Sequence, residues 1–207
     1  MEISLNKIGK RYLSDWVFRN LTFHFKMPAI YAVSGANGSG KSTLLNILSG
    51  HLTPTRGVIE YQLEGQKIET DQIYKHLSFA APYIDLIEEL TLLETIRFHQ
   101  QFKSFRVNLN RFDFIKLIEL EHAKNKEVRF FSSGMKQRLK LGLALCSDTP
   151  LVLLDEPTVT LDVQGIQWYQ QLLEKFSNDR LIIIASNEER DLISCKEERI
   201  NILDYKK

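Results

Sequence analysis

Few cysteines and no long apolar run limit what this chain of 207 residues can be. Its two cysteines, Cys146 and Cys195, lie far apart and lack the spacing of metal ligands. A disulfide is the alternative, but we expect reduced thiols in a cytosolic protein. The longest apolar runs, such as Leu181–Ala185, fall well short of the roughly 20 residues that cross a bilayer. The first residues, "MEISLNKIGKRY", contain no apolar signal core, so we expect a soluble protein whose membrane role depends on a partner chain.

An excess of charge of one sign is also missing. Lys and Arg number 27 against 26 Asp and Glu, which gives a net charge of +1. Because this balance leaves no basic excess for a phosphate backbone, we expect no nucleic-acid partner. Hydrophobic residues make up 43% of the chain and charged residues 26%, as in soluble globular domains. The length predicts a single domain over residues 1–207.

The order of the hydrophobic patterns predicts an α/β fold. Residues 3–12 and 21–25 alternate, which is typical of antiparallel strands, and Ala29–Ser34 is a short apolar strand. Later stretches alternate between strand and helix, at Leu151–Leu154, Gln164–Phe176, Leu181–Ala185, Glu188–Cys195 and Arg199–Leu203. This alternation predicts a mostly parallel sheet that follows an N-terminal antiparallel β part.

Helical spacing dominates residues 91–147 and interrupts that pattern. It marks three stretches, Thr91–Phe102, Asn110–Leu120 and Met135–Ser147. The first begins with Thr91 and Glu94 at the spacing of a capping box. We therefore expect a helical lobe at about residues 91–147, inserted into a core formed by residues 1–90 and 148–207.

A glycine-rich stretch, Gly35–Ser42, fits the pattern G-x-x-x-x-G-K-[ST]. Glycines let the backbone curl so that its N–H groups point at phosphate oxygens, and the following helix presents its positive end to the same anion. Lys41 can then reach the β- and γ-phosphates, while the Ser42 hydroxyl can ligate Mg²⁺. A glycine turn before a helix is the plain alternative, but the stretch also follows an apolar strand, as the motif requires. We predict a P-loop NTPase-type fold whose phosphate site comprises Gly35, Asn37, Gly38, Ser39, Gly40, Lys41, Ser42 and Thr43.

A second motif, "LVLLDEPT" from Leu151 to Thr158, ends an apolar strand in two acids. P-loop proteins hold Mg²⁺ through a carboxylate at such a strand end. Asp155 is therefore the candidate ligand for Mg²⁺ or its water, and Glu156 the candidate base that orients or activates the attacking water. A solvated turn is the alternative for the acid pair taken alone.

A third motif, "RFFSSGMKQRLKLGLAL" from Arg129 to Leu145, is a turn of small residues that opens a basic amphipathic helix. Helix capping by Ser132 or Ser133 would explain it by itself. The order of the three motifs, however, resembles the ATP-binding subunit of an ABC transporter over essentially the whole chain. The signature of that family reads Leu-Ser-Gly-Gly-Gln, and the matching residues here are 131–135, "FSSGM", a variant similar to those of exporter ATPases. Ser132 and Gly134 keep the hydroxyl and the bare backbone that meet the γ-phosphate of a facing subunit.

The resemblance implies a dimer of ATPase subunits, identical or different, that sandwiches two ATP molecules with Mg²⁺. Lys41 of one chain and Ser132 of the other would then share a nucleotide, and residues 160–162, "TLD", match the D-loop that crosses the interface. Tyr12 lies where the family stacks an aromatic ring on adenine; Trp16 is the alternative for that role, and an ordinary core or surface tyrosine is the alternative interpretation of Tyr12. The resemblance also implies an integral membrane transporter subunit as partner, which carries the cargo specificity, and a cytoplasmic location on the inner face of the cell membrane.

Two positions depart from the family pattern. In "LSFAAPYIDLIEELT", Pro82 stands at or beside a glutamine that approaches Mg²⁺ in the family, and Asn187 replaces the switch histidine. We therefore expect Glu156, Lys41 and Asn187 to carry a slow hydrolysis. The segment Tyr83–Phe102 has more apolar residues than the core needs, so we expect part of it to face the membrane subunit. A non-transport ABC ATPase acting as an ATP-gated scaffold or regulator is the alternative function.

Overall fold

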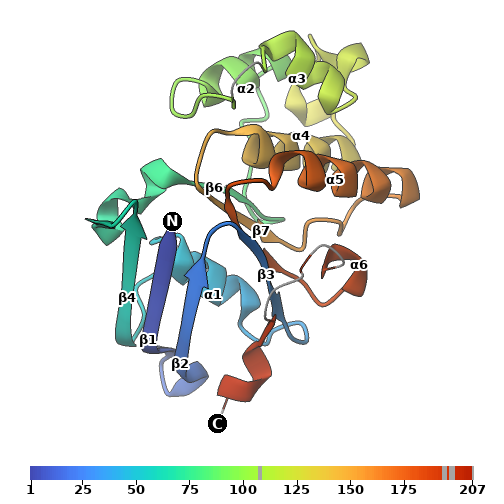
Figure 1. Cartoon of the computed structure of the whole chain (residues 1–207). Helices are drawn as coiled ribbons and strands as arrows, with labels where there is room; N and C mark the ends of the chain where they lie inside the picture. The colour runs from blue at the N-terminus through green and yellow to red at the C-terminus, as the bar shows by residue number, and fades with distance from the viewer. Residues whose placement is uncertain (107–108, 193–194, 196–198, 207) are drawn as a thin grey trace.

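The computed structural model describes residues 1–106, 109–192, 195 and 199–206. Its N-terminal part is an antiparallel sheet with the strand order β2-β1-β4-β5 (Figure 1). The strands are β1 (Glu2–Tyr12), β2 (Asp15–Lys26), β4 (Arg56–Leu63) and β5 (Gln66–Ile68). The alternation in the sequence therefore predicted the antiparallel start correctly, because each strand turns one side to the core and the other to solvent.

The second sheet is parallel and has the strand order β6-β7-β8-β3-β9. Its strands are β3 (Ala29–Ser34), β6 (Leu77–Ala80), β7 (Leu151–Asp155), β8 (Leu181–Ala185) and β9 (Arg199–Asn201). Strands β7 and β8 are buried along their whole length, which is why they read as unbroken apolar runs. Because the strands are parallel, the loop after β3 and the acids at the end of β7 leave from the same edge of the sheet.

The helices are α1 (Lys41–Leu48), α2 (Leu92–His99), α3 (Arg111–Leu117), α4 (Ser133–Cys146), α5 (Val163–Phe176) and α6 (Glu189–Leu192). Helices α2 to α5 lie at the predicted places, with ends that differ by at most three residues. Short 3-10 turns are η1 (Thr70–His76), η2 (Glu121–Ala123), η3 (Val128–Phe130) and η4 (Ile202–Tyr205). The capping box is confirmed, since the Thr91 hydroxyl accepts from the Glu94 N–H while the Glu94 carboxylate accepts from the Thr91 N–H.

Two predicted elements near the C-terminus differ from the structure. The expected strand Arg199–Leu203 ends early, at Asn201. The reason is that the Asn201 side chain accepts a hydrogen bond from the Leu203 N–H and starts η4 instead. Of the expected helix Glu188–Cys195, the described part forms only α6, and residues 193 and 194 lie outside the described residues.

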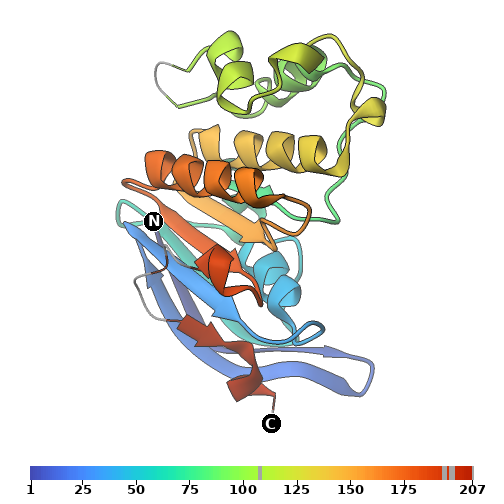
Figure 2. The ribbon, with the colours of Figure 1, turned by 90° about the vertical axis from the view of Figure 1, so that its right-hand side faces the viewer.

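The parallel sheet separates two hydrophobic clusters. Alternate residues of β7 show this, because Leu151 and Leu153 join a cluster with α1 and the antiparallel sheet. Val152 and Leu154 join the other cluster, with α4, α5 and the remaining helices. Figures 1 and 2 show α4 and α5 lying on one face of the sheet, with α2 and α3 farther out. The helical segment is therefore packed continuously onto the sheet through α4.

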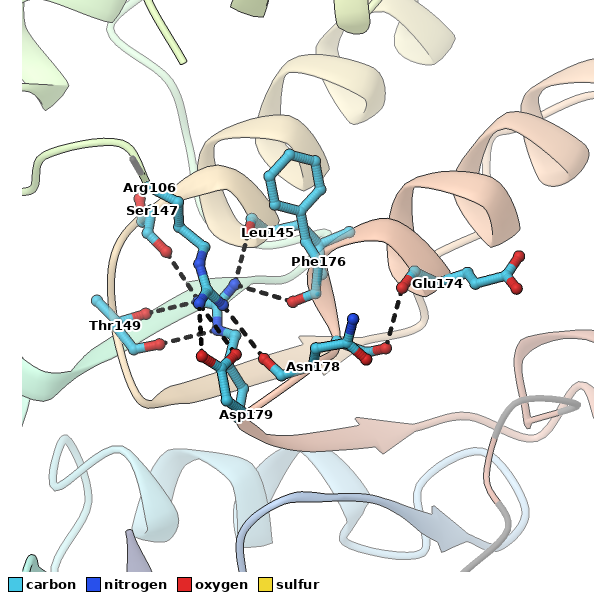
Figure 3. A network of polar contacts seen from close by, with 10 residues as sticks. Arg106, Leu145, Ser147, Thr149, Glu174, Phe176, Asn178 and Asp179 are labelled. Carbon is cyan, nitrogen blue, oxygen red and sulfur yellow. Dashed lines mark hydrogen bonds and ion pairs between the residues drawn. The ribbon is translucent and has the colours of Figure 1, made fainter. Parts of the chain in front are cut away.

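The edge of the sheet opposite the candidate site is held by a buried arginine. Arg180, which is 1% exposed and precedes β8, donates to the backbone carbonyls of Thr149, Leu145, Phe176 and Ser147 and to the Thr149 hydroxyl. These acceptors come from the ends of α4 and α5 and from the turn before β7 (Figure 3). Burial lowers the pKa of the guanidinium to about 10, so the group remains charged at neutral pH. One side chain thus donates to four buried carbonyl groups, of which, among the described residues, only that of Ser147 also accepts from a backbone N–H, that of Thr149.

Both cysteines are buried and carry free thiols, as expected from their spacing. Among the described residues, no helix is long and apolar enough to cross a membrane.

Candidate functional site

The glycine-rich loop joins the carboxyl end of β3 to the first turn of α1. Gly38 and Gly40 have φ angles of 72° and 111°, in the left-handed region that favours glycine. A Cβ on Gly40 would also lie 2.5 Å from the Val17 side chain, so no larger residue fits there. The loop borders a cavity of about 650 Å³, which also receives side chains from the ends of β7 and β8. The candidate site residues from the sequence that line this cavity are Asn37, Gly38, Ser39, Gly40, Lys41, Ser42, Thr43, Glu156 and Asn187.

Lys41, the first residue of α1, is 5% exposed. Its ammonium nitrogen donates to the backbone carbonyls of Gly35 and Ala36, at 2.9 and 3.4 Å. The same nitrogen lies 3.2 Å from a carboxylate oxygen of Glu156. The cation of the phosphate loop and the candidate base therefore lie side by side at the cavity.

A hydroxyl-carboxylate cluster holds Glu156 from the other side. The Ser186 hydroxyl lies 3.1 Å from Glu156 Oε2 and 2.5 Å from Asp191 Oδ2, and Thr158 donates to Asp191 Oδ1 at 2.5 Å. Glu156 itself has φ 45°, an uncommon conformation for a residue other than glycine. Burial raises the pKa of Asp191, and the hydrogen bonds from Ser186 and Thr158 oppose that rise. The sequence did not indicate this cluster. Asp191 is separated from Glu156 by α5 and β8, and it lies in a polar segment typical of the surface.

Asp155 ends β7 and is 1% exposed. Neither of its carboxylate oxygens has a hydrogen-bond partner among the described residues. Burial raises its pKa, while the hydroxyl groups of Ser42 and Tyr83 lie near enough to lower it. A buried carboxylate without partners, beside two hydroxyl groups and the phosphate loop, fits Mg²⁺, which takes oxygen ligands and keeps several waters. Ser42 and Asp155 are therefore suitable to hold the ion, and their role as its ligands stays a prediction.

Asn187 is exposed and lines the same cavity as Lys41 and Glu156, where the switch residue was expected. Tyr12, by contrast, is not among the residues that line this cavity. Its ring is 52% exposed, and the Lys10 ammonium lies 5.3 Å from its centroid. Val17 is the residue of β2 that borders the cavity. Adenine stacking on Tyr12 or Trp16 stays a prediction.

The signature residues border a different cavity, of about 400 Å³. Ser132 caps α4 by accepting from the Met135 N–H, and the Thr160 hydroxyl donates to the Ser133 carbonyl. Gly134 and residues 160–162 line this cavity too, whereas Lys41 and Glu156 line only the first among the cavities described. Within one chain, the phosphate loop and the signature therefore do not share a cavity.

The segment Tyr83–Phe102 divides into a buried and an exposed side. Leu92 and Ile96 are fully buried, whereas Ile87, Phe98 and Phe102 are 43%, 44% and 72% exposed. Phe98 and Phe102 also contact each other edge to face, with centroids 5.2 Å apart. The exposed side is the part of this segment that can meet another protein.

Comparison with known proteins connects the site to one family. The sequence pattern of the family described as "ABC transporter" matches residues 18–159, more than half of the chain. An uncharacterized ABC transporter ATP-binding protein of Bacillus subtilis, YybJ, is 32% identical over 199 residues, which cover 93% of this chain and 88% of YybJ. The human retinal-specific phospholipid-transporting ATPase ABCA4 is 33% identical over 181 residues, but these cover 84% of this chain and only 8% of ABCA4.

The solved structures agree with the sequence matches. The dimeric structure of MJ0796, a bacterial ABC transporter cassette, superposes with a TM-score of 0.82 and 25% identity over 97% of this chain and 95% of that one. The α/β fold predicted from the sequence, with its parallel sheet, antiparallel sheet and helices, is the fold of these cassettes.

Proposed function

The chain is an ATP-binding ATPase of the ABC transporter family, and from this premise we propose that two ATPase subunits close around Mg·ATP and drive a separate membrane-spanning subunit. The observation that carries the proposal is the arrangement of three groups around one cavity. The curled phosphate loop and the buried ammonium of Lys41 line it, and the unpartnered carboxylate of Asp155 lies beside Ser42 of that lining. Together they provide what a nucleotide with its cation requires, namely N–H donors, a fixed positive charge and an oxygen ligand.

Lys41 changes partners when a nucleotide enters. Its ammonium now lies against the Glu156 carboxylate and two loop carbonyls, all of which are weaker competitors than a polyphosphate that carries several charges. The β- and γ-phosphates draw Lys41 away from Glu156, which frees that carboxylate to accept a proton from water. Substrate binding thus prepares the base.

Glu156 then acts as the general base. Ser186 and the left-handed backbone of Glu156 orient its carboxylate toward the cavity, where it removes a proton from the water that attacks the γ-phosphorus. The bond between the γ-phosphorus and the bridging oxygen breaks, and ADP leaves with that oxygen. Bound Mg²⁺, held through Ser42 and Asp155, would neutralise charge on the phosphate oxygens during this transfer. Asn187 can donate one amide hydrogen bond to the γ-phosphate but, unlike histidine, cannot become charged, which supports slow hydrolysis.

A second ATPase subunit completes the site. Ser132 and Gly134 border a cavity separate from that of Lys41, so they can act on a nucleotide only if another chain presents them. The dimeric form of the related MJ0796 cassette supports the same arrangement here. A homodimer or a heterodimer would place each signature against the phosphate loop of the partner.

The membrane-spanning partner would dock on the exposed side of Tyr83–Phe102. Ile87, Phe98 and Phe102 offer apolar surface there, and the neighbouring loop is tied to α4, which begins at the signature. A contact at this surface can therefore reach the ATP site through packed elements. The subunit would lie peripherally on the inner face of the cell membrane.

The proposal is tested by the binding and hydrolysis of ATP in Lys41→Ala. We expect the variant to lose binding of a fluorescent ATP analogue and to lose Mg²⁺-dependent phosphate release, with an unchanged circular dichroism spectrum. Lys67→Ala, at an exposed position in β5, is the matched control and should behave as wild type. Unaltered ATP affinity in Lys41→Ala would refute the site assignment.

A further inference from the structure

Tyr83 follows β6 in a loop that several contacts hold in place. Lys140 of α4 donates to the backbone carbonyls of Ala81 and Pro82, at 3.4 and 3.0 Å. The Tyr83 ring packs edge to face on Phe79, with centroids 6.4 Å apart. Tyr83 is 49% exposed, and its hydroxyl contacts Asn46 of α1. The loop is therefore fixed at both its backbone and its aromatic ring.

The hydrogen bonds of Asn46 determine which way the Tyr83 hydroxyl hydrogen points. The amide nitrogen of Asn46 donates to the Ser42 carbonyl at 2.9 Å, and a carbonyl can only accept, so this atom must be the nitrogen. The same nitrogen lies 3.2 Å from the Tyr83 hydroxyl oxygen, which therefore accepts. The hydroxyl hydrogen is left free to be donated elsewhere.

The Tyr83 hydroxyl lies close to the proposed Mg²⁺ ligands, because the Asn46 amide nitrogen bridges it to the Ser42 carbonyl and Asp155 is near enough to affect the pKa of the phenol. A tyrosine phenol, with an ordinary pKa of about 10, keeps its hydrogen at neutral pH. Both carboxylate oxygens of Asp155 lack a hydrogen-bond partner in the described part of the chain. A donor held beside an unsatisfied metal-binding carboxylate is suited to a water or a phosphate oxygen between them.

From this geometry we propose that Tyr83 is a positioning residue of the Mg²⁺ site, whose hydroxyl, fixed by Asn46, donates to an oxygen bound to the ion and so orients the ion on Asp155 and Ser42. This inference rests on the proposed nucleotide site. It assigns to Tyr83 the polar contact that Pro82 cannot make, because proline has no polar side-chain group. Since Lys140 ties the loop to α4, the helix that begins at the signature also positions Tyr83.

The test measures metal affinity rather than turnover. Mn²⁺ replaces Mg²⁺, and electron paramagnetic resonance counts free Mn²⁺ in the presence of a non-hydrolysable ATP analogue. Tyr83→Phe keeps the ring and removes only the hydroxyl, and we expect it to weaken Mn²⁺ binding about tenfold, as is usual when a partner of a bound oxygen is lost. Affinity for the analogue without metal should not change. Tyr74→Phe is the matched control, because the structure gives the Tyr74 hydroxyl no hydrogen bond among the described residues, and it should bind Mn²⁺ as wild type does.

Three outcomes distinguish the proposed role of Tyr83 from the proposed nucleotide site. A tenfold loss in Tyr83→Phe alone supports the inference. Equal Mn²⁺ affinity in wild type and Tyr83→Phe, with both binding the analogue, overturns it and leaves Tyr83 as part of the docking surface. Failure of the wild type to bind Mn²⁺ with the analogue overturns the nucleotide site itself. Thermal unfolding of each variant checks that the loop has not been disrupted.

Discussion

The ammonium nitrogen of Lys41 lies 3.2 Å from a carboxylate oxygen of Glu156, so the phosphate-binding cation and the candidate base are paired before any nucleotide enters. Both groups are largely shielded from water, with 5% and 22% of their side chains exposed, which strengthens the attraction between them. The pair keeps each charge compensated in the free protein. It also means that binding of phosphate and release of the base are one event.

Glu156→Gln should remove hydrolysis and preserve ATP binding. The amide cannot take a proton from water, and loss of a general base typically slows a reaction by about 10²–10⁴-fold. ATP affinity should be equal or somewhat higher, because Lys41 no longer has a charged competitor. Phosphate release and equilibrium binding measure the two effects. Glu188→Gln, which removes a carboxylate that lines the same cavity without an ion pair to Lys41, is the control. Hydrolysis that survives in Glu156→Gln would assign the base elsewhere.

Asn187→His should raise kcat and leave KM nearly unchanged. A hydrogen bond to a charged group is worth about 1.5–3 kcal/mol. If asparagine lacks most of this interaction in the transition state, the histidine variant gains roughly tenfold to a hundredfold in rate. Asn187→Ala should be as slow as wild type or slower. A single-turnover assay on wild type and the two variants measures the three hydrolysis rates. A wild-type rate equal to that of histidine-containing relatives, together with an unaffected Asn187→Ala, would show that another group has this role.

Arg180→Met should destabilise the fold by about 3–5 kcal/mol, because the buried carbonyls of Leu145 and Thr149 would lose their donor. Urea unfolding at neutral pH measures the change in the free energy of unfolding. Arg106→Met is the matched control. It breaks an ion pair with Asp179, whose side chain is 71% exposed, so we expect a loss of at most about 1 kcal/mol. Equal losses in the two variants would contradict the structural role of Arg180.

Phe98→Asp combined with Phe102→Asp should break co-purification with a membrane-spanning partner and leave the basal ATPase unchanged. Both rings are exposed and contact each other, so charges there disturb the surface and not the core. Leu13→Asp, in the turn between β1 and β2, is the control, because Leu13 is 97% exposed on a different part of the chain. Tyr83 is unsuitable for this test because its hydroxyl contacts Asn46. A partner that still co-purifies with the double variant would place the docking surface elsewhere.

Local patterns in the sequence were sufficient to predict most of the strands and helices. The apolar runs Ala29–Ser34 and Leu181–Ala185 coincide with β3 and β8, because strands buried on both faces carry no other pattern. The capping box at Thr91 likewise fixed the start of α2. The position of the phosphate loop between β3 and α1 was also predictable, because its glycines favour the left-handed backbone conformation that the loop adopts.

Contacts between distant segments were not predictable in the same way. Arg180 follows a polar turn and reads as a surface charge, but the ends of α4 and α5 and the turn before β7 converge on it and bury it. Asp191 reaches Ser186 and Thr158 only because the loops after β7 and β8 leave the same edge of the sheet. Tyr83 could not be placed from the sequence either, because its aromatic character indicated a docking surface, whereas in the folded loop its hydroxyl contacts Asn46 of α1.

The central claim is that one nucleotide is shared by Lys41 of one chain and Ser132 of another. It is tested most directly by the mass of Glu156→Gln in multi-angle light scattering, with and without ATP. The account predicts the mass of two chains with ATP, the mass of one chain without it, and the mass of one chain under both conditions when Lys41→Ala is added. Glu156→Gln that binds ATP and still has the mass of one chain, at nucleotide concentrations well above its dissociation constant, would contradict the account.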